Sequence, residues 1–587
     1  MHWFMPASAT CSFPVASRTA VLSVLLLLAA DRASAEQATV AWDSNPEPDV
    51  AGYYVSYGTT AGQYLMRVDA GPRTSYTFFG LPAGSRFYFV VEAYGRDGLV
   101  GPRSAEVAYL VPGTPAPDVD VDGIADAWQA LYGVTSPTAD PDGDGISNLN
   151  EYYLGTDPTI PNRWILAEGA TGFFNERLAL ANPTSVPAEV QVTFLREIGT
   201  PVARDYSVPP KGRITVDVEQ IPGLESVSVS AVVNTRRGGV VAERTMSWEW
   251  GSYAGAHTAK AVTSAATEWH LAEGSSGFFD TWILLANAND ASSTAILTFL
   301  REDATTVTRG YTLAPKSRLS VYANGVPGLA NRSYSTTVTS TLPITVERAM
   351  YFGSPLWQGG HAAAGATAPA TSWFVAEGRT GPFFDTWLLL ANPGPSPTTA
   401  RVDFLLPRGG VVTRFYTLPK TSRTTIFVDS LPGLNDTDVS ASITAGAPII
   451  VERSMYWPGD FTQWYEAHNS LGMTSLGTRW AFAEGEVGGR SQSSTYVLLA
   501  NPGPSPVTAT LTFLRAQGRP PVTISVTVAA RSRLTISASD VPQLASGERF
   551  GMLVEASGPI AVESSLYWNA GGKYWGSGTN ETGVKLK

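Results

Sequence analysis

One string of residues, Trp-x-x-Ala-Glu-Gly, occurs four times in this chain of 587 residues. The glutamates of the four copies are 105, 104 and 107 residues apart, at Glu168, Glu273, Glu377 and Glu484. A second string, Val-Glu-Arg or a variant of it, follows in phase at Glu243, Glu347, Glu452 and Glu563. Sequence that recurs at a fixed period forms the same structural unit each time. We therefore expect four similar units, called repeats 1 to 4 below, at residues 163–267, 268–371, 372–478 and 479–587.

Apolar and polar residues alternate within each repeat. In repeat 1, Val190, Val192 and Phe194 alternate with Gln191 and Thr193. A period of two is typical of a strand with one face on a core and the other in water. Turns rich in Pro and Gly separate such runs, and about seven strands fit into each repeat. The sequence predicts an all-β multidomain protein of tandem Ig-like antiparallel β-sandwiches. Their cores should include these pairs: Val192 and Phe194, Leu297 and Phe299, Val402 and Phe404, Leu511 and Phe513.

The repeats resemble an uncharacterised family of sandwich modules in bacterial secreted proteins, on their Ala-Glu-Gly, Leu-x-x-Asn-Pro and Val-Glu-Arg strings. That resemblance implies an architecture and no activity. Residues 36–112 resemble a fibronectin type III domain, in which 39–42 and 52–55 match early strands and 81–87 match the corner before a late strand. Phe87 stands where that family carries a tyrosine, and almost no residues remain for a first strand.

The first 35 residues have the pattern of a secretory signal peptide. Arg18 precedes an apolar run at 20–30, and a cleavage site of the A-x-A form follows at 33–35. The run is too short for a membrane span, which needs about 20 residues. The single cysteine, Cys11, lies in this segment, so the mature chain would form no disulfide. We expect a secreted, extracellular protein with no transmembrane segment after cleavage.

The charge of the chain is concentrated in one place. The formal net charge is −11, from 40 basic and 51 acidic residues, which argues against a nucleic-acid partner because such partners select a basic surface. Residues 118–157 hold nine acidic residues and no basic residue. This stretch lies in a linker that we place at 113–162, between the fibronectin-like domain and repeat 1.

Two acidic strings in this linker carry the clearest chemistry. The pattern Asp-x-Asp-x-Asp-Gly occurs at 118–123 and again at 140–145, where Glu151 follows at the twelfth position. This is the calcium-loop spacing, in which carboxylates two residues apart converge on an ion that takes about six to eight oxygens. The expected Ca²⁺ ligands, with each isoleucine acting through its carbonyl, are Asp118, Asp120, Asp122, Ile124 and Asp126 in the first loop and Asp140, Asp142, Asp144, Ile146, Asn148 and Glu151 in the second.

The two loops are not equivalent. The first has Gln129 at its twelfth position, so we expect it to bind calcium more weakly. Each loop runs into a short amphipathic helix that should end at Gly133 or Gly155. Pro115 and Pro117 exclude the incoming helix of an EF-hand. The segment resembles thrombospondin type 3 repeats of the bacterial kind.

A structural alternative exists for the late polar residues of each loop. Asp126 with Gln129, and Asn148 with Glu151, have the spacing of a helix capping box. Capping does not account for three alternating aspartates before a glycine, whose mutual repulsion requires a cation. We therefore expect calcium in both loops.

Three recurrent residue types in the repeats allow two interpretations each. The paired carboxylates have the composition of a glycosidase site, or they bind arginine and backbone amides. Since each Val-Glu-Arg string puts Glu and Arg on opposite faces of a strand, we expect one of the two to point inward.

His257, His361 and His468 could join glutamates at a metal, or only form hydrogen bonds. The tryptophan of each string could stack on a sugar, or lie buried at the junction. We favour the structural interpretation throughout, because four identical catalytic centres in tandem would be unusual.

The sequence thus predicts a secreted, non-catalytic surface or matrix protein that presents or bridges binding surfaces in adhesion or as a scaffold, with a calcium-rigidified linker. The alternative is a carbohydrate-binding accessory protein or a remote hydrolase. No motif identifies the ligand, which could be a cell surface, a glycan or a protein.

Overall fold

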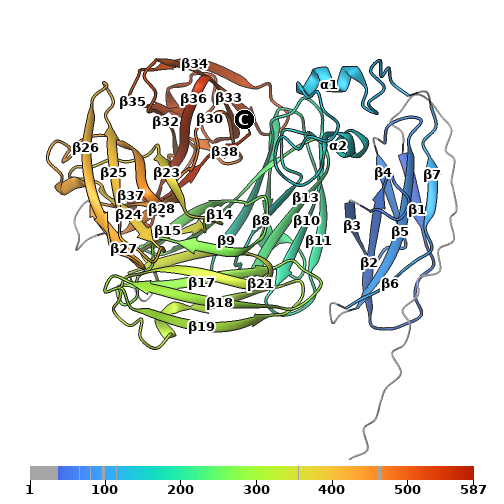
Figure 1. Cartoon of the computed structure of the whole chain (residues 1–587), viewed down its shortest axis with the longest axis horizontal. Coiled ribbons are helices and arrows are strands. Elements are labelled where there is room, and N and C mark those ends of the chain that lie inside the picture. The colour runs from blue at the N-terminus through green and yellow to red at the C-terminus, as the bar shows by residue number, and fades with distance from the viewer. Residues whose placement is uncertain are drawn as a thin grey trace, which may run out of the picture. The chain divides into compact units, whose positions relative to one another are not determined.

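The computed structural model describes residues 37–64, 66–79, 81–95, 99–113, 115–353, 356–458 and 464–586 (Figure 1). The described chain is all-β, with antiparallel sheets and two α-helices of seven residues. It forms two compact units, Met1–Ala116 and Pro117–Lys587. The predicted signal peptide, with Cys11, lies outside the described residues. Within them, no helix has the length and apolar character needed to cross a membrane.

The first unit is a two-sheet sandwich. One sheet pairs β1 with β4, and the other has the order β3-β2-β5-β6 with β7 on β5. Val55, Phe87 and Phe89 are buried between them. The expected sandwich fold is therefore confirmed for this unit, and its smaller sheet contains two described strands. The strands are β1 (Gln37–Ala41), β2 (Val50–Gly58), β3 (Met66–Gly71), β4 (Ser75–Phe79), β5 (Arg86–Gly95), β6 (Val100–Arg103) and β7 (Val107–Leu110).

The second unit begins with α1 (Asp126–Tyr132) and α2 (Asn148–Leu154) and continues with strands to its end. Repeat 1 forms two four-stranded sheets, with orders β11-β10-β13-β8 and β12-β9-β14-β15. Its strands are β8 (Arg163–Leu166), β9 (Asn175–Asn182), β10 (Ala188–Arg196), β11 (Val202–Val208), β12 (Gly212–Asp217), β13 (Val229–Arg237), β14 (Val241–Trp250) and β15 (Tyr253–Lys260).

Repeats 2 to 4 follow the same plan, except that one long strand in each (β21, β28 or β36) takes part in both sheets. A single turn of 3-10 helix recurs in each repeat. The strands of repeat 2 are β16 (Ala266–Leu271), β17 (Phe279–Asn287), β18 (Ser293–Arg301), β19 (Thr306–Leu313), β20 (Ser317–Tyr322), β21 (Tyr334–Phe352) and β22 (Gly359–Ala364). Those of repeat 3 are β23 (Ala370–Val375), β24 (Asp385–Asn392), β25 (Thr398–Leu405), β26 (Val411–Leu418), β27 (Ser422–Phe427), β28 (Ser440–Trp457) and β29 (Glu466–Leu471). Those of repeat 4 are β30 (Gly477–Phe482), β31 (Glu486–Val487), β32 (Ser494–Asn501), β33 (Val507–Arg515), β34 (Val522–Val528), β35 (Ser532–Ser537), β36 (Glu548–Ala570), β37 (Lys573–Thr582) and β38 (Val584–Lys585).

The core of each repeat lies between its two sheets. The side chains expected there are all buried, which confirms the period-two interpretation. Their exposed fractions are 0% or 1% for Val192, Phe194, Leu297, Phe299, Val402, Phe404, Leu511 and Phe513.

The four repeats contact one another in a closed circuit. Strand β15 of repeat 1 contacts β22 of repeat 2 and β37 of repeat 4, and β29 of repeat 3 contacts the same two strands. Figure 1 shows the repeats following one another from green through yellow and orange to red. These four strands are the outer strands of their sheets, so each sheet edge is covered by two neighbouring repeats.

A single carboxylate lies where the four strands meet. Glu466 accepts hydrogen bonds from the amides of Ala256 at 2.8 Å, Gly360 at 3.0 Å and Ala467 at 3.0 Å. It also accepts one from the amide of Gly578. These four amides occupy the same position in the four repeats, and the other repeats have Gly255, Gly359 and Ser577 in place of the glutamate. Burial raises the pKa of Glu466 well above its usual range, and the amide donors oppose that rise.

The recurrent Glu and Arg lie at the seams between repeats. At the seam of repeats 1 and 2, Glu347 accepts from the Ala167 amide at 2.6 Å and from Arg244 at 2.9 Å. Arg244 also pairs with Glu168 at 3.0 Å. The next two seams repeat this pattern with Glu452, Arg348 and Glu273 and with Glu563, Arg453 and Glu377. Both Glu and Arg are buried, because the neighbouring repeat covers the second face of the sheet; the expectation that only one of them points inward was wrong.

The seam that joins repeat 4 to repeat 1 departs from this pattern. Repeat 4 has Ser564 where the others have the arginine. Glu484 therefore pairs with Arg213 of repeat 1, at 2.9 Å. Glu243 accepts from the Glu484 amide at 2.9 Å and from the Ala483 amide, but no arginine of the described residues pairs with it. Burial, with the charges of Glu581 and Glu484, raises the pKa of Glu243 to about 8.

Removing a seam carboxylate should destabilise the second unit strongly. In Glu452→Ala the guanidinium of Arg348 keeps only Glu273 as an anionic partner while fully buried. We expect the free energy of unfolding to fall by about 3–5 kcal/mol, measured by denaturant titration. Glu555→Ala removes a half-exposed partner of Arg479 and should change it by about 0–1 kcal/mol. Equal effects of the two substitutions would contradict the seam assignment.

Restoring the missing arginine should have the opposite effect. Ser564→Arg would place a guanidinium between Glu243 and Glu484, as at the other three seams. We expect a gain of about 1–3 kcal/mol and a higher melting temperature, because a buried carboxyl group without a cationic partner becomes a charge-assisted acceptor. Thr508→Arg, at an exposed position of β33, is the control that should leave the melting temperature unchanged. A lower melting temperature for Ser564→Arg would show that this seam lacks the geometry of the others.

Candidate metal centre

The two acidic loops lie directly before the two helices. The helices end at Gly133 and Gly155, which have left-handed backbones with φ of 69° and 72°, as expected. The residues that precede the helices are Ala125 and Ser147, and neither forms a side-chain capping hydrogen bond. The capping interpretation of the late polar residues is therefore wrong for both helices.

The second loop brings Asp140, Asp142 and Asp144 together, with one carboxylate oxygen of each within 4.8 Å of the others. Asp140 accepts hydrogen bonds from the amides of Gly143 at 2.8 Å and Gly145 at 2.9 Å. The amide of Ile146 donates to Asp144 at 2.8 Å. The backbone thus turns around the carboxylates, and both glycines have positive φ, at 74° and 89°.

Asn148 and Glu151 lie on α2, directly after the same loop, and Glu151 stands outside the group of three aspartates. Their exposed fractions are 0% and 1%. Glu151 Oε1 accepts from Asn162 at 3.0 Å and Thr156 at 3.2 Å. Three oxygens here are buried without a partner: Glu151 Oε2, Asp142 Oδ2 and Asn148 Oδ1. Unpartnered buried oxygens from three residues fit a bound cation.

The electrostatics of the second loop point the same way. Burial, followed by the charges of Asp142 and Asp144, raises the pKa of Glu151 to about 10. Burial and the charge of Asp144 raise the pKa of Asp142 to about 8. These shifts mark negative charge that the described residues leave uncompensated, and a divalent cation would reverse them.

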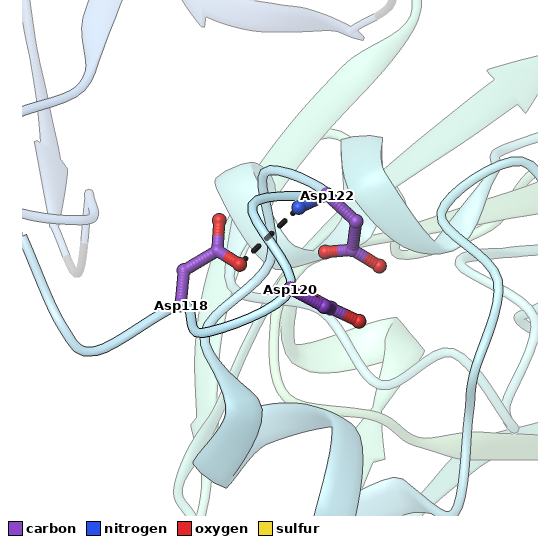
Figure 2. Close-up of side chains that lie close together, drawn as sticks. All are labelled: Asp118, Asp120 and Asp122. Atoms are coloured by element: carbon purple, nitrogen blue, oxygen red, sulfur yellow. Dashed lines mark hydrogen bonds between the residues drawn. The ribbon is translucent and has the colours of Figure 1, made fainter.

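The first loop is more open. Asp118, Asp120 and Asp122 also approach within 4.8 Å, and Figure 2 shows the Asp118 carboxylate turned toward the Asp122 amide at 3.2 Å. Gln129 donates to Asp122 at 2.9 Å, so the residue at position twelve binds a carboxylate. Asp120 is exposed, and no acidic oxygen of residues 118–126 is both buried and unpartnered. The second loop is the better-formed candidate.

The remaining predicted ligands are placed as follows. Asp126 accepts from the Val119 amide at 3.2 Å and stands outside the group of three aspartates. The Ile124 amide donates to Asp122 at 2.9 Å, which folds this residue into the first loop as the Ile146 amide does in the second. The donors in both loops are oxygens, the set preferred by Ca²⁺ and Mg²⁺ over softer metals.

The acidic segment is fixed to the repeats on both sides of the closing seam. Asp144 accepts from the Asn162 amide at 2.8 Å, and Asn162 leads directly into β8. The Asp157 amide donates to Gly238 of repeat 1 at 3.1 Å, and Ile160 is part of the repeat 1 core. Arg479 of repeat 4 donates to Thr159 at 3.3 Å. The segment therefore bridges repeats 1 and 4.

The other recurrent residues are buried in strands. His257, His361 and His468 each form a hydrogen bond with a tyrosine of the next repeat, at 2.9–3.3 Å, and burial lowers the pKa of each well below its usual range. Among the described residues, the two aspartate triads are the groups close enough to share one ion, and no histidine joins them. The four junction tryptophans, Trp164, Trp269, Trp373 and Trp480, are 0–1% exposed.

Sequence reasoning missed one set of functional residues, the arginines that cross the seams from the other side. Arg318, Arg423 and Arg533 each donate to the carbonyl of the glycine in the preceding Ala-Glu-Gly string, at 2.5–2.8 Å. Their recurrence in phase with Arg213 was the available signal. Glu466 occurs once, so no repeat pattern could have singled it out.

No family model and no curated protein matches the chain. It is similar to the 6th fibronectin type III domain of human fibronectin type III domain containing protein 3, with 26% identity over 18% of this chain and 96% of that one and a TM-score of 0.14. It is similar to the FN1–FN3 domains of chicken CNTN1, with 12% identity, coverages of 60% and 97% and a TM-score of 0.14. It is also similar to a tetra-tandem repeat in the extending region of a large adhesion protein, with 11% identity, coverages of 69% and 94% and a TM-score of 0.10. Likenesses this low identify no family for the chain.

The raised pKa of Glu151 predicts a pH dependence in the absence of metal. A carboxyl whose folded pKa exceeds its unfolded value contributes stability below the unfolded pKa, near 4.5, and loses it as pH rises toward about 10. In EDTA, the melting temperature of the native chain should therefore fall between pH 5.5 and 8.5. Glu151→Gln should flatten that fall, whereas Glu189→Gln, on β10, should not. Identical pH slopes for all three proteins would contradict the assignment.

Proposed function

We propose that this chain is a secreted, non-catalytic scaffold or adhesion protein whose ring of four repeats is stabilised by calcium at its closing seam. The observation that carries the calcium assignment is that three oxygens of the second loop and α2, from Asp142, Asn148 and Glu151, are each buried without a hydrogen-bond partner. The calcium-loop spacing of 140–151 supports calcium over magnesium, which requires stricter octahedral geometry and keeps more of its water.

Calcium in the second loop would act beyond the loop. Asn162 donates one hydrogen bond from its backbone amide to Asp144 and one from its side chain to Glu151. It therefore binds both carboxylates. Its carbonyl accepts from the Thr235 amide of β13 at 2.7 Å. A cation that fixes these carboxylates thereby fixes the start of β8 against repeat 1, next to the contact of Arg479 with Thr159. We infer that calcium strengthens the link across repeats 1 and 4.

The burial of the recurrent carboxylates supports a non-catalytic role. In the first three seams each recurrent glutamate is paired with a buried arginine, and a side chain held in this way is not available as a general acid or nucleophile. Exposed aromatic residues, which are enriched in protein interfaces, support a binding surface. They include Phe173 at 43%, Trp250 at 69%, Phe278 at 59% and Tyr574 at 61% exposed.

One pocket favours carbohydrate binding as a second candidate function. A cavity of about 260 Å³ at the seam of repeats 3 and 4 has Tyr496, Tyr567 and Trp575 in its wall, beside Arg379 and Asp438. Aromatic faces with a few polar groups are typical of ligand pockets. A glycan array probed with the mature chain and with Tyr496→Ala distinguishes this candidate, since specific glycan binding lost in the variant would establish it.

Calcium titration of the mature chain tests the proposal. We expect calorimetry to give a dissociation constant on the order of 10⁻⁴–10⁻³ M, and saturating calcium to raise the free energy of unfolding by about 2–3 kcal/mol at a hundredfold excess over that constant. Asp142→Asn should abolish the tighter binding event. Asp120→Asn should remove only the weaker one, and Asp303→Asn, outside both loops, should change neither. Absence of heat, or equal heats for Asp142→Asn and the native chain, would refute the calcium assignment.

A further inference from the structure

Residues of all four repeats line a cavity where β15, β22, β29 and β37 end. Its volume is about 560 Å³, within the range of small-molecule pockets. Corresponding residues of all four repeats line it, and we call it the axial funnel. We call Val262, Ala366, Met473 and Val584 its floor and the residue after each of them, Thr263, Thr367, Thr474 and Lys585, its rim. Ala366, Met473 and Val584 are buried, whereas Thr367, Thr474 and Lys585 are exposed.

The floor of the axial funnel is apolar because its backbone groups are already paired. The carbonyls of Val262, Ala366 and Met473 accept from the amides of Ile165, His270 and Phe374 at 2.8 Å each. The indole nitrogens of the neighbouring Trp269 and Trp373 donate to backbone carbonyls. The side chains of Ala366, Met473 and Val584 add apolar surface, and each residue is 7% exposed. Trp164 also lines the cavity, and its buried indole nitrogen has no hydrogen-bond partner among the described residues.

Positive charge lies on one side of the axial funnel. Lys585 occupies the rim position that is threonine in the other three repeats, and it is exposed with its amine 2.7 Å from Ser475 Oγ. Lys260 also lines the cavity, and its amine donates to Thr582. Among the residues that the structure describes, no acidic one lines the cavity. Glu581, whose carboxylate accepts from the Lys260 amide at 2.7 Å, is outside the lining.

We propose that the axial funnel binds an anionic amphiphile, a monocarboxylate with an unbranched apolar tail. The tail occupies the apolar floor, where burial of hydrocarbon supplies the affinity. The carboxylate lies at the rim beside Lys585, with the threonine hydroxyls as further donors. The site belongs to the closed ring, since each of the four repeats contributes one residue to its floor and one to its rim.

Sodium decanoate below its micellar concentration is the probe, titrated by calorimetry into the full mature chain in calcium. We expect one site per chain, with nonanoate bound about fourfold more weakly because one fewer methylene is buried. Lys585→Gln should weaken decanoate binding about two- to fivefold and leave decanol binding unchanged. Lys573→Gln, a lysine of β37 outside the cavity, is the matched control and should bind decanoate as the native chain does.

A second variant tests the cavity itself. Ala366→Phe places a ring in the floor and should abolish decanoate binding, and circular dichroism melting checks that the variant folds. The proposal fails if the native chain binds no decanoate, or if Lys585→Gln and Lys573→Gln bind it equally. It also fails if the chain binds vesicles of anionic phospholipid but not monomeric decanoate, because a membrane surface would then be the partner.

Discussion

A glutamate of one repeat reaches into the backbone of the repeat before it, and the rest of the structure depends on that contact. Glu347, Glu452 and Glu563 each accept the amide of the alanine in the preceding Ala-Glu-Gly string and pair with that repeat's arginine. A buried charge is tolerated only when it is paired and hydrogen-bonded. The partners of each of these glutamates come from the preceding repeat and not from the glutamate's own repeat. A single repeat would therefore leave its glutamate without them. This makes the ring, and not the single sandwich, the stable unit.

The ring closes at the seam of repeats 4 and 1, whose charged residues differ from those of the other three seams. Ser564 leaves Glu243 and Glu484 without the arginine that the other seams provide, and Arg213 compensates only the latter. Two other features hold repeats 4 and 1 together although this arginine is missing. Glu466 gathers one amide from each repeat at the centre, and the acidic segment spans the seam from Gly238 to Arg479. A cation in the second loop would therefore act next to the seam that lacks the buried arginine of the other three.

The sequence predicted the local structure well and the assembly poorly. Period-two alternation placed Phe194 and Leu297 in cores, and the Asp-x-Asp-x-Asp-Gly strings placed two compact acidic loops before helices that end at Gly133 and Gly155. Alternation describes which face of one strand is apolar, but it does not say what covers the opposite face. The contacts between repeats were therefore not predicted. A signal for them existed, because Glu452 and Arg453 lie on opposite faces of one strand and each needs a partner of opposite charge when buried. The histidine pattern likewise could not reveal its tyrosine partners, which come from the next repeat.

Hydrogen exchange of the four central strands tests the closed ring most directly. In isolated sandwiches β15, β22, β29 and β37 would be sheet edges, with half of their amides open to water. The closed ring predicts slow exchange for the amides of Ala256, Gly360, Ala467 and Gly578, as slow as for core amides of β10 or β33. Exchange of these four amides at the rate of exposed edge strands, with the cores still protected, would contradict it.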